Sequence, residues 1–436
     1  MVSSLESLRG SSRHGIGFSS SAEPHLASVT TSSTSYRALC RRDINMGHNH
    51  NTNNVDIIDI GGGRLKDSLR NMLIARMLDP TKQCVLPSAL LSDDHGAMLW
   101  TKINRLPDYY QTRDEIALLE VHGKEIADVI PPDCLLIDIG CGDTRKVLPL
   151  LVHLDRIKKP VHYYGLDLSL PALQSTLSQL ATHNFSHITL HGLWGTFDDA
   201  IHFVPTLSPP STSSYPSPPS SPSCSPGSAP APAQPPRWFL SLGSILGNDF
   251  PEPATKILSR WTALLRPDPT PTPANGPTTT TGDRILLGMD STTSPTLLWA
   301  SYHDPQNLFE QFMRNGLQHS NRVLGVNWYR PEDWDVVGVM STKYVMHQFM
   351  FRAKRDVRCE APGPGPGPGG VVKIEFPKGH EIDCYEAFKF GPEEMGEQFR
   401  GAGVREVGRW KAPGSSGIYE YLLCRDTTSQ QVNGES

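Results

Sequence analysis

Two glycines follow a strand-like segment and precede a helix-like one, a pattern typical of a ligand-binding turn. In the stretch DCLLIDIGCGDTRKVLPLL, residues 133–151, an apolar run leads into Gly140 and Gly142 and then into helical periodicity. Glycine at such a turn lets the backbone approach a ligand where a side chain would collide. A dinucleotide fingerprint would need a third glycine at Arg145, which disfavours a nicotinamide or flavin cofactor. A lone G-x-G can also be a plain tight connection.

Two further chemical signals come at the ends of the next two strand-like runs. Asp167 ends the run in YYGLDLS, where a carboxylate can accept hydrogen bonds from ribose hydroxyls. The alternative is a helix cap, a role that Ser169 fills equally well. Thr196 and Phe197 end the following run in GLWGTFDDA, where a ring and a polar group could hold an adenine. Three such elements at successive strand ends favour S-adenosylmethionine, with its methionine part against the glycine turn.

The segments around these residues alternate between buried strands and amphipathic helices. Apolar runs predict strands in residues 134–140, 161–168, 187–195, 237–247 and 284–290, and helical periodicity occupies residues 144–157, 171–183 and 252–266. Strands that alternate with helices predict an α/β fold with a doubly wound, Rossmann-like parallel sheet. In such a sheet, ligands bind at the carboxyl ends of the strands, where the strand order reverses.

Composition indicates a globular protein with a small-molecule partner. The 436 residues are 38% hydrophobic and 19% charged, enough for one large or two ordinary domains. A net charge of -5 without basic runs disfavours nucleic acid, and no apolar run could span a membrane. Eight cysteines without a C-x-x-C pair suggest reduced thiols in the cytoplasm. His48 and His50 in GHNHN lack acidic or cysteine partners, so no metal is expected.

Four segments have compositions that do not support a packed core. Residues 1–54 are rich in Ser, Thr and Asn and predict a disordered tail. Their arginines would also fit a mitochondrial transit peptide, and Met46 could be the true start, but a plain tail is favoured. The Pro- or Gly-rich stretches 205–236, 267–283 and 361–370 predict loops that interrupt the fold without ending it.

Four longer stretches carry a family resemblance. They are INRLPDYYQTRDE (103–115), FLSLGSILGNDFPEPATKIL (239–258), GMDSTTSPTLLWASYHD (288–304) and CYEAFKF (384–390). Together with the cofactor elements they resemble the histidine-specific methyltransferase-like family. The resemblance implies S-adenosylmethionine as cofactor and two domains. A smaller α+β substrate domain would comprise residues 55–115 and 291–389, and the methyltransferase domain residues 116–290 and 390–436, with a C-terminal tail.

The resemblance also implies roles for individual residues. The cofactor would be bound by Gly140, Gly142, Lys146 and Asp167, with Thr196 and Phe197 near its adenine. Thr196 stands where the bacterial branch has an acid. The amino-acid end of a substrate would be held by a clamp of Tyr109, Asn248 and Tyr302, because phenols and amides can bind a carboxylate and an amide carbonyl can orient an amine. Otherwise, the two tyrosines would be core or helix-face aromatics and Asn248 a helix cap.

Two departures from the family pattern bear on the substrate. Ser92 replaces a tyrosine that faces the amine in the histidine-specific branch, and Tyr385, followed by Glu386, replaces a glutamate that holds the imidazole. An imidazole without its partner binds poorly, so histidine is disfavoured. The resulting prediction is N-methylation of the α-amine of a tryptophan derivative, such as 4-dimethylallyltryptophan in fungal alkaloid synthesis. Histidine Nα-methylation of the ergothioneine type, or a catalytically silent binding protein on this fold, remain alternatives.

Overall fold

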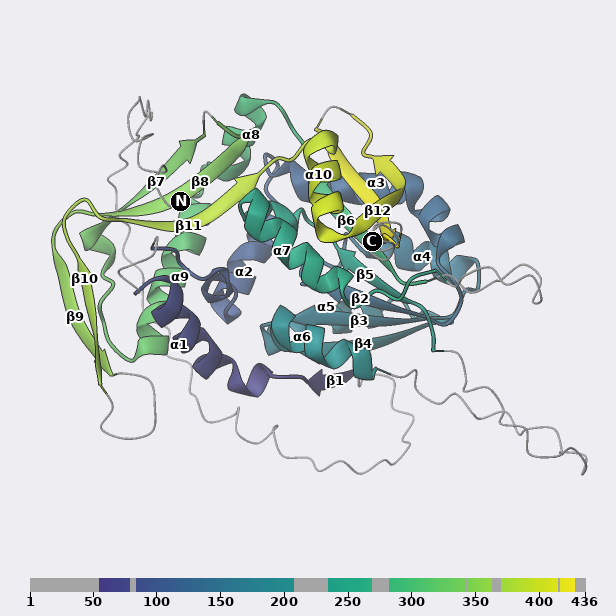
Figure 1. The fold of residues 1–436 in the computed structure, drawn as a ribbon, viewed down its shortest axis with the longest axis horizontal. Helices are drawn as coiled ribbons and strands as arrows, with labels where there is room; N and C mark the ends of the chain where they lie inside the picture. Colours follow the sequence, from purple (N-terminus) through teal and green to yellow (C-terminus); the bar gives the residue numbers. More distant parts are fainter. Residues whose placement is uncertain are drawn as a thin grey trace, which may run out of the picture. The chain divides into compact units, whose positions relative to one another are not determined.

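The computed structural model describes residues 55–78, 84–207, 234–268, 282–341, 343–362, 370–414 and 416–427 (Figure 1). These described residues form one compact unit. The predicted tail 1–54, with its His48 and His50, and most of the three predicted loops lie outside the described residues. Within the described ranges, no helix is long and apolar enough to cross a membrane.

An eight-stranded sheet contains all five strands predicted around the glycine turn. Its order is β1-β4-β3-β2-β5-β6-β13-β12, and the first six of these strands are parallel. The strands are β1 (Asp56–Asp59), β2 (Cys134–Ile139), β3 (Val161–Asp167), β4 (Ile188–Trp194), β5 (Arg237–Ser241), β6 (Arg284–Asp290), β12 (Val404–Lys411) and β13 (Ile418–Arg425). Since β2 lies between β3 and β5, the strand order reverses there. The predicted doubly wound sheet is confirmed.

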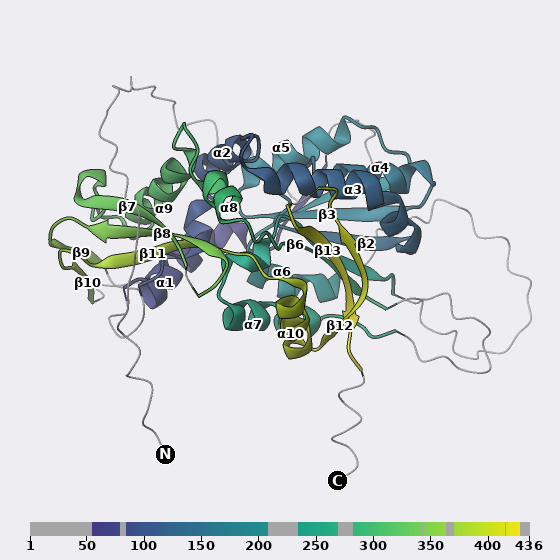
Figure 2. The ribbon, with the colours of Figure 1, turned by 90° about the horizontal axis from the view of Figure 1, so that it is seen from above.

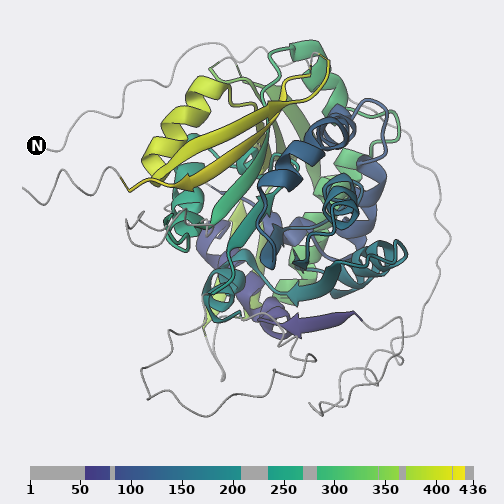
Figure 3. The same cartoon turned by 90° about the vertical axis from the view of Figure 1, so that its right-hand side faces the viewer.

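Helices cover both faces of this sheet because alternate strand residues point to opposite sides. One face packs against α3 (Tyr110–Val129), α4 (Leu148–Arg156) and α5 (Leu170–Ala181), and the other against α6 (Phe197–Phe203), α7 (Pro251–Thr262) and α10 (Pro392–Ala402). Leu136 of β2 belongs to the first core, whereas its neighbours Leu135 and Ile137 belong to the second. Figures 2 and 3 show the two helix layers, with α10 in yellow opposite α3 and α4 in blue.

A smaller α+β part has a core of its own. An antiparallel sheet of order β11-β8-β7 and a β9-β10 hairpin pack with helices from two distant parts of the chain. These elements are α1 (Leu65–Arg76), α2 (Asp94–Ile103), α8 (Pro295–Tyr302), α9 (Leu308–Leu324), β7 (Trp334–Met340), β8 (Met346–Ala353), β9 (Val357–Pro362), β10 (Val371–Phe376) and β11 (Glu381–Phe388). The predicted domain boundaries stay a prediction, and β1, from the first predicted substrate segment, pairs with β4 of the large sheet.

Two predicted elements differ in their bounds. The strand predicted over 237–247 ends at Ser241, because Gly243 and Ser244 both have positive φ (82° and 59°), which extended backbone cannot accommodate. A 3-10 helix, η5 (Ile245–Asn248), follows. The helix predicted from residue 144 begins as α4 only at Leu148, since the preceding residues continue the glycine turn.

Candidate active site

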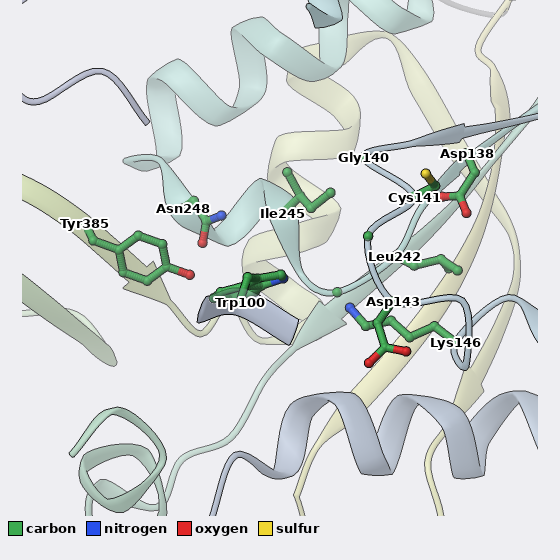
Figure 4. A pocket seen from close by; sticks show the side chains of 12 residues that line it. Trp100, Asp138, Gly140, Cys141, Asp143, Lys146, Leu242, Ile245, Asn248 and Tyr385 are labelled. Carbon is green, nitrogen blue, oxygen red and sulfur yellow. The ribbon is translucent and has the colours of Figure 1, made fainter. Parts of the chain in front are cut away.

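A cavity opens at the carboxyl ends of β2 and β5, where the strand order reverses. It has about 470 Å³ of space not filled by atoms, part of it open to solvent. Its lining is shown in Figure 4 and consists of Trp100, Asp138, Gly140, Cys141, Gly142, Asp143, Lys146, Leu242, Gly243, Ile245, Asn248 and Tyr385. Doubly wound sheets bind their ligands at this position.

The glycine turn has the backbone geometry that its sequence predicted. Gly140 and Gly142 have φ of 75° and 38°, in the left-handed region that residues with a Cβ rarely adopt. A Cβ on Gly140 would lie 3.4 Å from Ile245 Cδ1 and 3.6 Å from Phe197 Cζ. The turn therefore presents bare backbone to the cavity, with the Phe197 ring beside it. These features fit the methionine part and the adenine of S-adenosylmethionine.

Asp167 lies at the carboxyl end of β3, next to the turn. Burial raises the pKa of its carboxyl to about 6, against the opposing effect of backbone N–H groups of Ser169, Leu168 and Gly142. The Ser169 N–H donates to it at 2.9 Å, while the Ser169 hydroxyl caps α5 by accepting from Ala172 N. Asp167 is thus not the helix cap, and it stands beside the cavity without lining it. Its contact with ribose remains a prediction.

Thr196 is the N-cap of α6. Its hydroxyl accepts from the Asp199 N–H at 3.0 Å and donates to the Asp199 carboxylate at 2.6 Å, and that carboxylate also accepts from the Thr196 N–H. This is a reciprocal capping box with aspartate in place of the usual glutamate. The hydroxyl is engaged in starting the helix, so the adenine contact predicted for Thr196 stays a prediction.

Lys146 reaches from the glycine turn to the loop after β5. Its ammonium lies 3.4 Å from Glu115 Oε2, and Glu115 Oε1 accepts the Gly243 N–H at 2.5 Å. Glu420 packs against the same place, and burial together with Glu115 raises its pKa well above the usual range. The side chains of Glu115 and Glu420 are 2% and 0% exposed. Glu115 of α3 thus joins the glycine turn after β2 to the loop after β5, and both Lys146 and Gly243 line the cavity.

A pH dependence follows from Asp138, which lines the cavity. Burial raises its pKa from 3.8 to about 7, although the Tyr163 hydroxyl donates to it at 2.7 Å. The pKa of Asp138 is higher in the folded chain than in the unfolded chain. Its contribution to the free energy of unfolding is therefore fully present below about pH 4, and it is lost as the pH rises through 7. Asp138→Asn keeps an acceptor for Tyr163. Between pH 5 and pH 8 its free energy of unfolding should therefore rise relative to that of the wild type by about 3 kcal/mol, because about two pH units of this interval lie below the folded pKa.

Urea denaturation without cofactor at these two pH values measures this difference in the free energy of unfolding. Identical pH profiles for the wild type and Asp138→Asn would mean that Asp138 is ionised throughout, contrary to this expectation.

The predicted amino-acid clamp is divided between the cavity wall and the layer behind it. Asn248, at the end of η5, lines the cavity directly. Tyr109 and Tyr302 are 3% and 2% exposed, and their rings meet edge to face at 6.2 Å. Trp100 lies 5.8 Å from the Tyr109 ring and Tyr385 lies 6.2 Å from the Tyr302 ring. The two phenols therefore lie just behind the aromatic residues that form the wall.

Of the three residues predicted for the side-chain pocket, only Tyr385 lines the cavity. Glu386 points to the opposite face of β11, where Gln348 donates to it at 3.4 Å and burial raises its pKa to about 7. Ser92 follows the short helix η3 (Ser88–Leu91), and its N–H donates to Ala89 O. Neither Ser92 nor Glu386 belongs to the cavity lining.

Trp100 is a site residue that sequence reasoning missed. It lies on α2, and its ring packs against Tyr109 and, at 5.4 Å, against Phe312. A single tryptophan on an amphipathic helix usually predicts a core residue. The only sequence feature that indicated a site residue was the position of Trp100 just before the INRLPDYY stretch. Gln111 and Glu115, within the same resembling stretch, were also not singled out.

A glycine turn at the point where the strand order reverses, followed by an acid at the end of the next strand, is the arrangement with which doubly wound sheets bind a cofactor that contains a nucleoside. The chain belongs to the family described as histidine-specific methyltransferase, SAM-dependent, whose sequence profile matches residues 67–425. It is therefore an S-adenosylmethionine-dependent methyltransferase.

Three relatives illustrate the range of this family. Ergothioneine biosynthesis protein 1 of Neurospora crassa is 28% identical over 87% of this chain, which spans only 37% of that relative's length. N-methyltransferase imqF of Aspergillus flavus is 25% identical, covering 81% of this chain and 84% of the relative. 4-Dimethylallyltryptophan N-methyltransferase easF of Arthroderma benhamiae is also 25% identical, covering 84% and 97%.

Proposed function

We propose that the chain transfers a methyl group to the α-amine of an amino acid and that the substrate is a tryptophan derivative such as 4-dimethylallyltryptophan. The observation that carries this proposal is the aromatic character of one end of the cavity. Figure 4 shows Trp100 and Tyr385 on either side of Asn248. Asp138 and Asp143, the carboxylates among the described lining residues, are at the other end, beside the glycine turn.

An aromatic wall favours an indole over an imidazole. Apolar side chains bury the large apolar face of an indole, which has a single N–H to satisfy, whereas an imidazole has less apolar surface and two ring nitrogens that would lose hydrogen bonds to water. Tyr385 stands where the family resemblance implies a glutamate, and its pKa is raised by burial, so the phenol stays neutral. The name of the easF relatives supports a tryptophan derivative as substrate.

The residues of the chain contribute alignment and desolvation. When bound, S-adenosylmethionine supplies a methyl group on a positively charged sulfur. Asn248 lines the cavity between Tyr385 and Trp100, and its amide offers both a carbonyl acceptor and N–H donors to the amino-acid end of the substrate. Holding two reactants in near-attack geometry contributes several kcal/mol to catalysis. Burial beside Trp100 also favours the uncharged amine, the form that can attack.

Histidine is the second candidate. The family description names histidine, and the Neurospora crassa relative acts in ergothioneine biosynthesis according to its name. Both candidates share the reacting group, an α-amine next to a carboxylate. They differ in the side-chain end of the cavity, where Tyr385 lies.

Tyr385→Glu tests whether Tyr385 makes the enzyme prefer a tryptophan derivative to histidine. The substitution should lower kcat/KM for tryptophan and 4-dimethylallyltryptophan by about tenfold or more and raise the activity on histidine relative to both. A buried carboxylate is costly unless it is hydrogen-bonded, and an imidazole can donate to it whereas an apolar prenylated indole face cannot. Tyr385→Phe, which keeps the ring, is the matched control and should retain the wild-type order of substrates. An unchanged histidine-to-tryptophan ratio in Tyr385→Glu would remove Tyr385 from substrate selection.

A further inference from the structure

Helix α2, which carries Trp100, is connected to both of the loops that we expect to bind the cofactor. These are the glycine turn after β2 and the loop that follows Asp167 at the end of β3. Trp100 lines the cavity together with Gly140 and Lys146, and Figure 4 shows its ring between Asn248 and Lys146. The helix therefore forms part of the cavity wall beside the glycine turn.

The first connection joins the beginning of α2 to the loop after β3. The Ser169 hydroxyl donates to Asp94 Oδ1 at 2.9 Å, and the Ser169 N–H donates to Asp167. Ser169 is buried, whereas Asp94 is exposed. Because water competes for an exposed acceptor, the hydrogen bond between Ser169 and Asp94 contributes little to the stability of the fold and can break and re-form.

The second connection joins the end of α2 to the glycine turn. The Arg145 guanidinium donates to the backbone carbonyl of Asn104 at 3.0 Å, and its Nε donates to the Asp143 carboxylate at 2.9 and 3.0 Å. Asn104 is the C-cap of α2, and its side-chain amide donates to the Trp100 carbonyl at 3.0 Å. Arg145 therefore links the turn to the residue that ends the helix of Trp100. It stands where a dinucleotide fingerprint would have its third glycine.

The opposite side of α2 is held more firmly. Leu99 and Ile103 are 1% and 0% exposed within the core of the smaller α+β part. At the beginning of the helix, the Asp93 carboxylate accepts from the side-chain amide of Asn315 on α9 at 2.6 Å. Leaving an apolar core costs far more free energy than breaking two partly exposed hydrogen bonds. The contacts of α2 with the two loops are therefore the ones that can open while the helix stays packed against α9.

We propose that α2 is a lid over the cofactor, that Ser169 and Arg145 are positioning residues that hold it closed, and that it releases both when the cofactor enters or leaves. The Trp100 ring is the part of this lid that covers the cavity. Lid motions commonly control the exchange of ligands in enzymes. The inference goes beyond the proposed function, because it holds for whichever amine is methylated.

The exchange of S-adenosylhomocysteine, the form of the cofactor without its methyl group, tests the proposal. Asp94→Ala removes the acceptor of the Ser169 hydroxyl. Because opening breaks this hydrogen bond with and without bound ligand, the association and dissociation rate constants should both rise about threefold to tenfold, and the Kd should change by no more than about twofold. Asp94→Asn keeps an accepting oxygen and is the matched control, with rate constants like those of the wild type. Stopped-flow fluorescence measures both rate constants.

Two further variants test the second connection and the role of Trp100. Arg145→Lys keeps a positive charge beside Asp143, but a single ammonium cannot reproduce the fork that also reaches Asn104. It should accelerate association and dissociation as Asp94→Ala does. Trp100→Ala removes the ring that covers the cavity, so adding Asp94→Ala to this variant should accelerate exchange no further.

Three outcomes would overturn the proposal. Faster dissociation without faster association in Asp94→Ala would mean that Asp94 supports the bound cofactor itself. Wild-type rate constants in Asp94→Ala would mean that α2 does not open at Ser169, and this variant decides the matter even if Arg145→Lys does not fold. An undiminished effect of Asp94→Ala in the Trp100→Ala background would mean that the connection does not act through Trp100. None of these results depends on methyl transfer, so each would leave the proposed function intact.

Discussion

Asn248→Ala should lower kcat/KM about 100-fold for every amino acid that the wild type accepts. Asn248 is the clamp residue that lines the cavity directly, and it lies between Tyr385 and Trp100. Its loss removes the group that orients the reacting end, whatever side chain the substrate carries. Removing one such orienting hydrogen-bonding group typically costs about 2.7 kcal/mol or more in the transition state, which corresponds to this factor. Steady-state methyl transfer on a panel of amino acids measures it.

The matched control is Asn71→Ala, an exposed position on α1 where the same substitution should leave the kinetics unchanged. A loss in Asn248→Ala that is confined to one amino acid would contradict the shared role, because it would assign Asn248 to side-chain recognition.

Gly140→Val should weaken the binding of S-adenosylmethionine by at least about 100-fold. The residue has φ of 75°, and the added side chain would project toward Ile245 and Phe197. A β-branched residue in this conformation is strained by about 1–3 kcal/mol. The side chain would also occupy the space through which the backbone contacts the cofactor, so strain and exclusion act together. Isothermal titration with S-adenosylmethionine measures the effect on affinity.

Gly325→Val separates the two causes. Gly325 ends α9 with nearly the same φ, 74°, and an added Cβ would have nothing within 4 Å. Both variants should lower the melting temperature to a similar degree, but Gly325→Val should bind the cofactor as the wild type does. Wild-type cofactor affinity in Gly140→Val would show that the glycine turn is only a tight connection.

The strands of the central sheet could be predicted because a buried strand has a mostly apolar sequence of its own. All residues of β2 are buried, so its sequence is apolar except for Asp138, and β3 and β6 are nearly as buried and mostly apolar. The glycine turn could be predicted for a related reason, since only glycine adopts its positive φ without strain. Both features could be predicted because they depend on residues that are neighbours in the sequence.

Edge strands and hydrogen-bond partners could not be predicted in this way. β1 has the sequence DIID with both ends exposed, and it becomes a strand only because β4 offers it a parallel partner. β12 has mostly exposed or half-buried residues and depends on β13 in the same manner. Both are defined by pairing with distant strands, which composition does not reveal.

The candidate site shows the same limit. The resemblance named Tyr109 and Tyr302, but the bond from Gln111 to Tyr302 joins residues that are 191 positions apart and exists only once α8 packs beside α3. Ser92 was placed in the pocket by analogy, and its position after η3 puts it outside the cavity lining. Residue types were predictable, whereas their neighbours depend on the tertiary fold.

Methyl transfer from S-adenosylmethionine to an amino-acid panel, followed by mass spectrometry of the product, tests the central claim most directly. The panel should contain 4-dimethylallyltryptophan, tryptophan and histidine together with their carboxylate-free amines. We expect a methylated α-amine on the indole-bearing amino acids, with kcat/KM above that for histidine. A preference for histidine would contradict the assignment of the aromatic wall, and methylation of no amino acid would contradict the proposed function altogether.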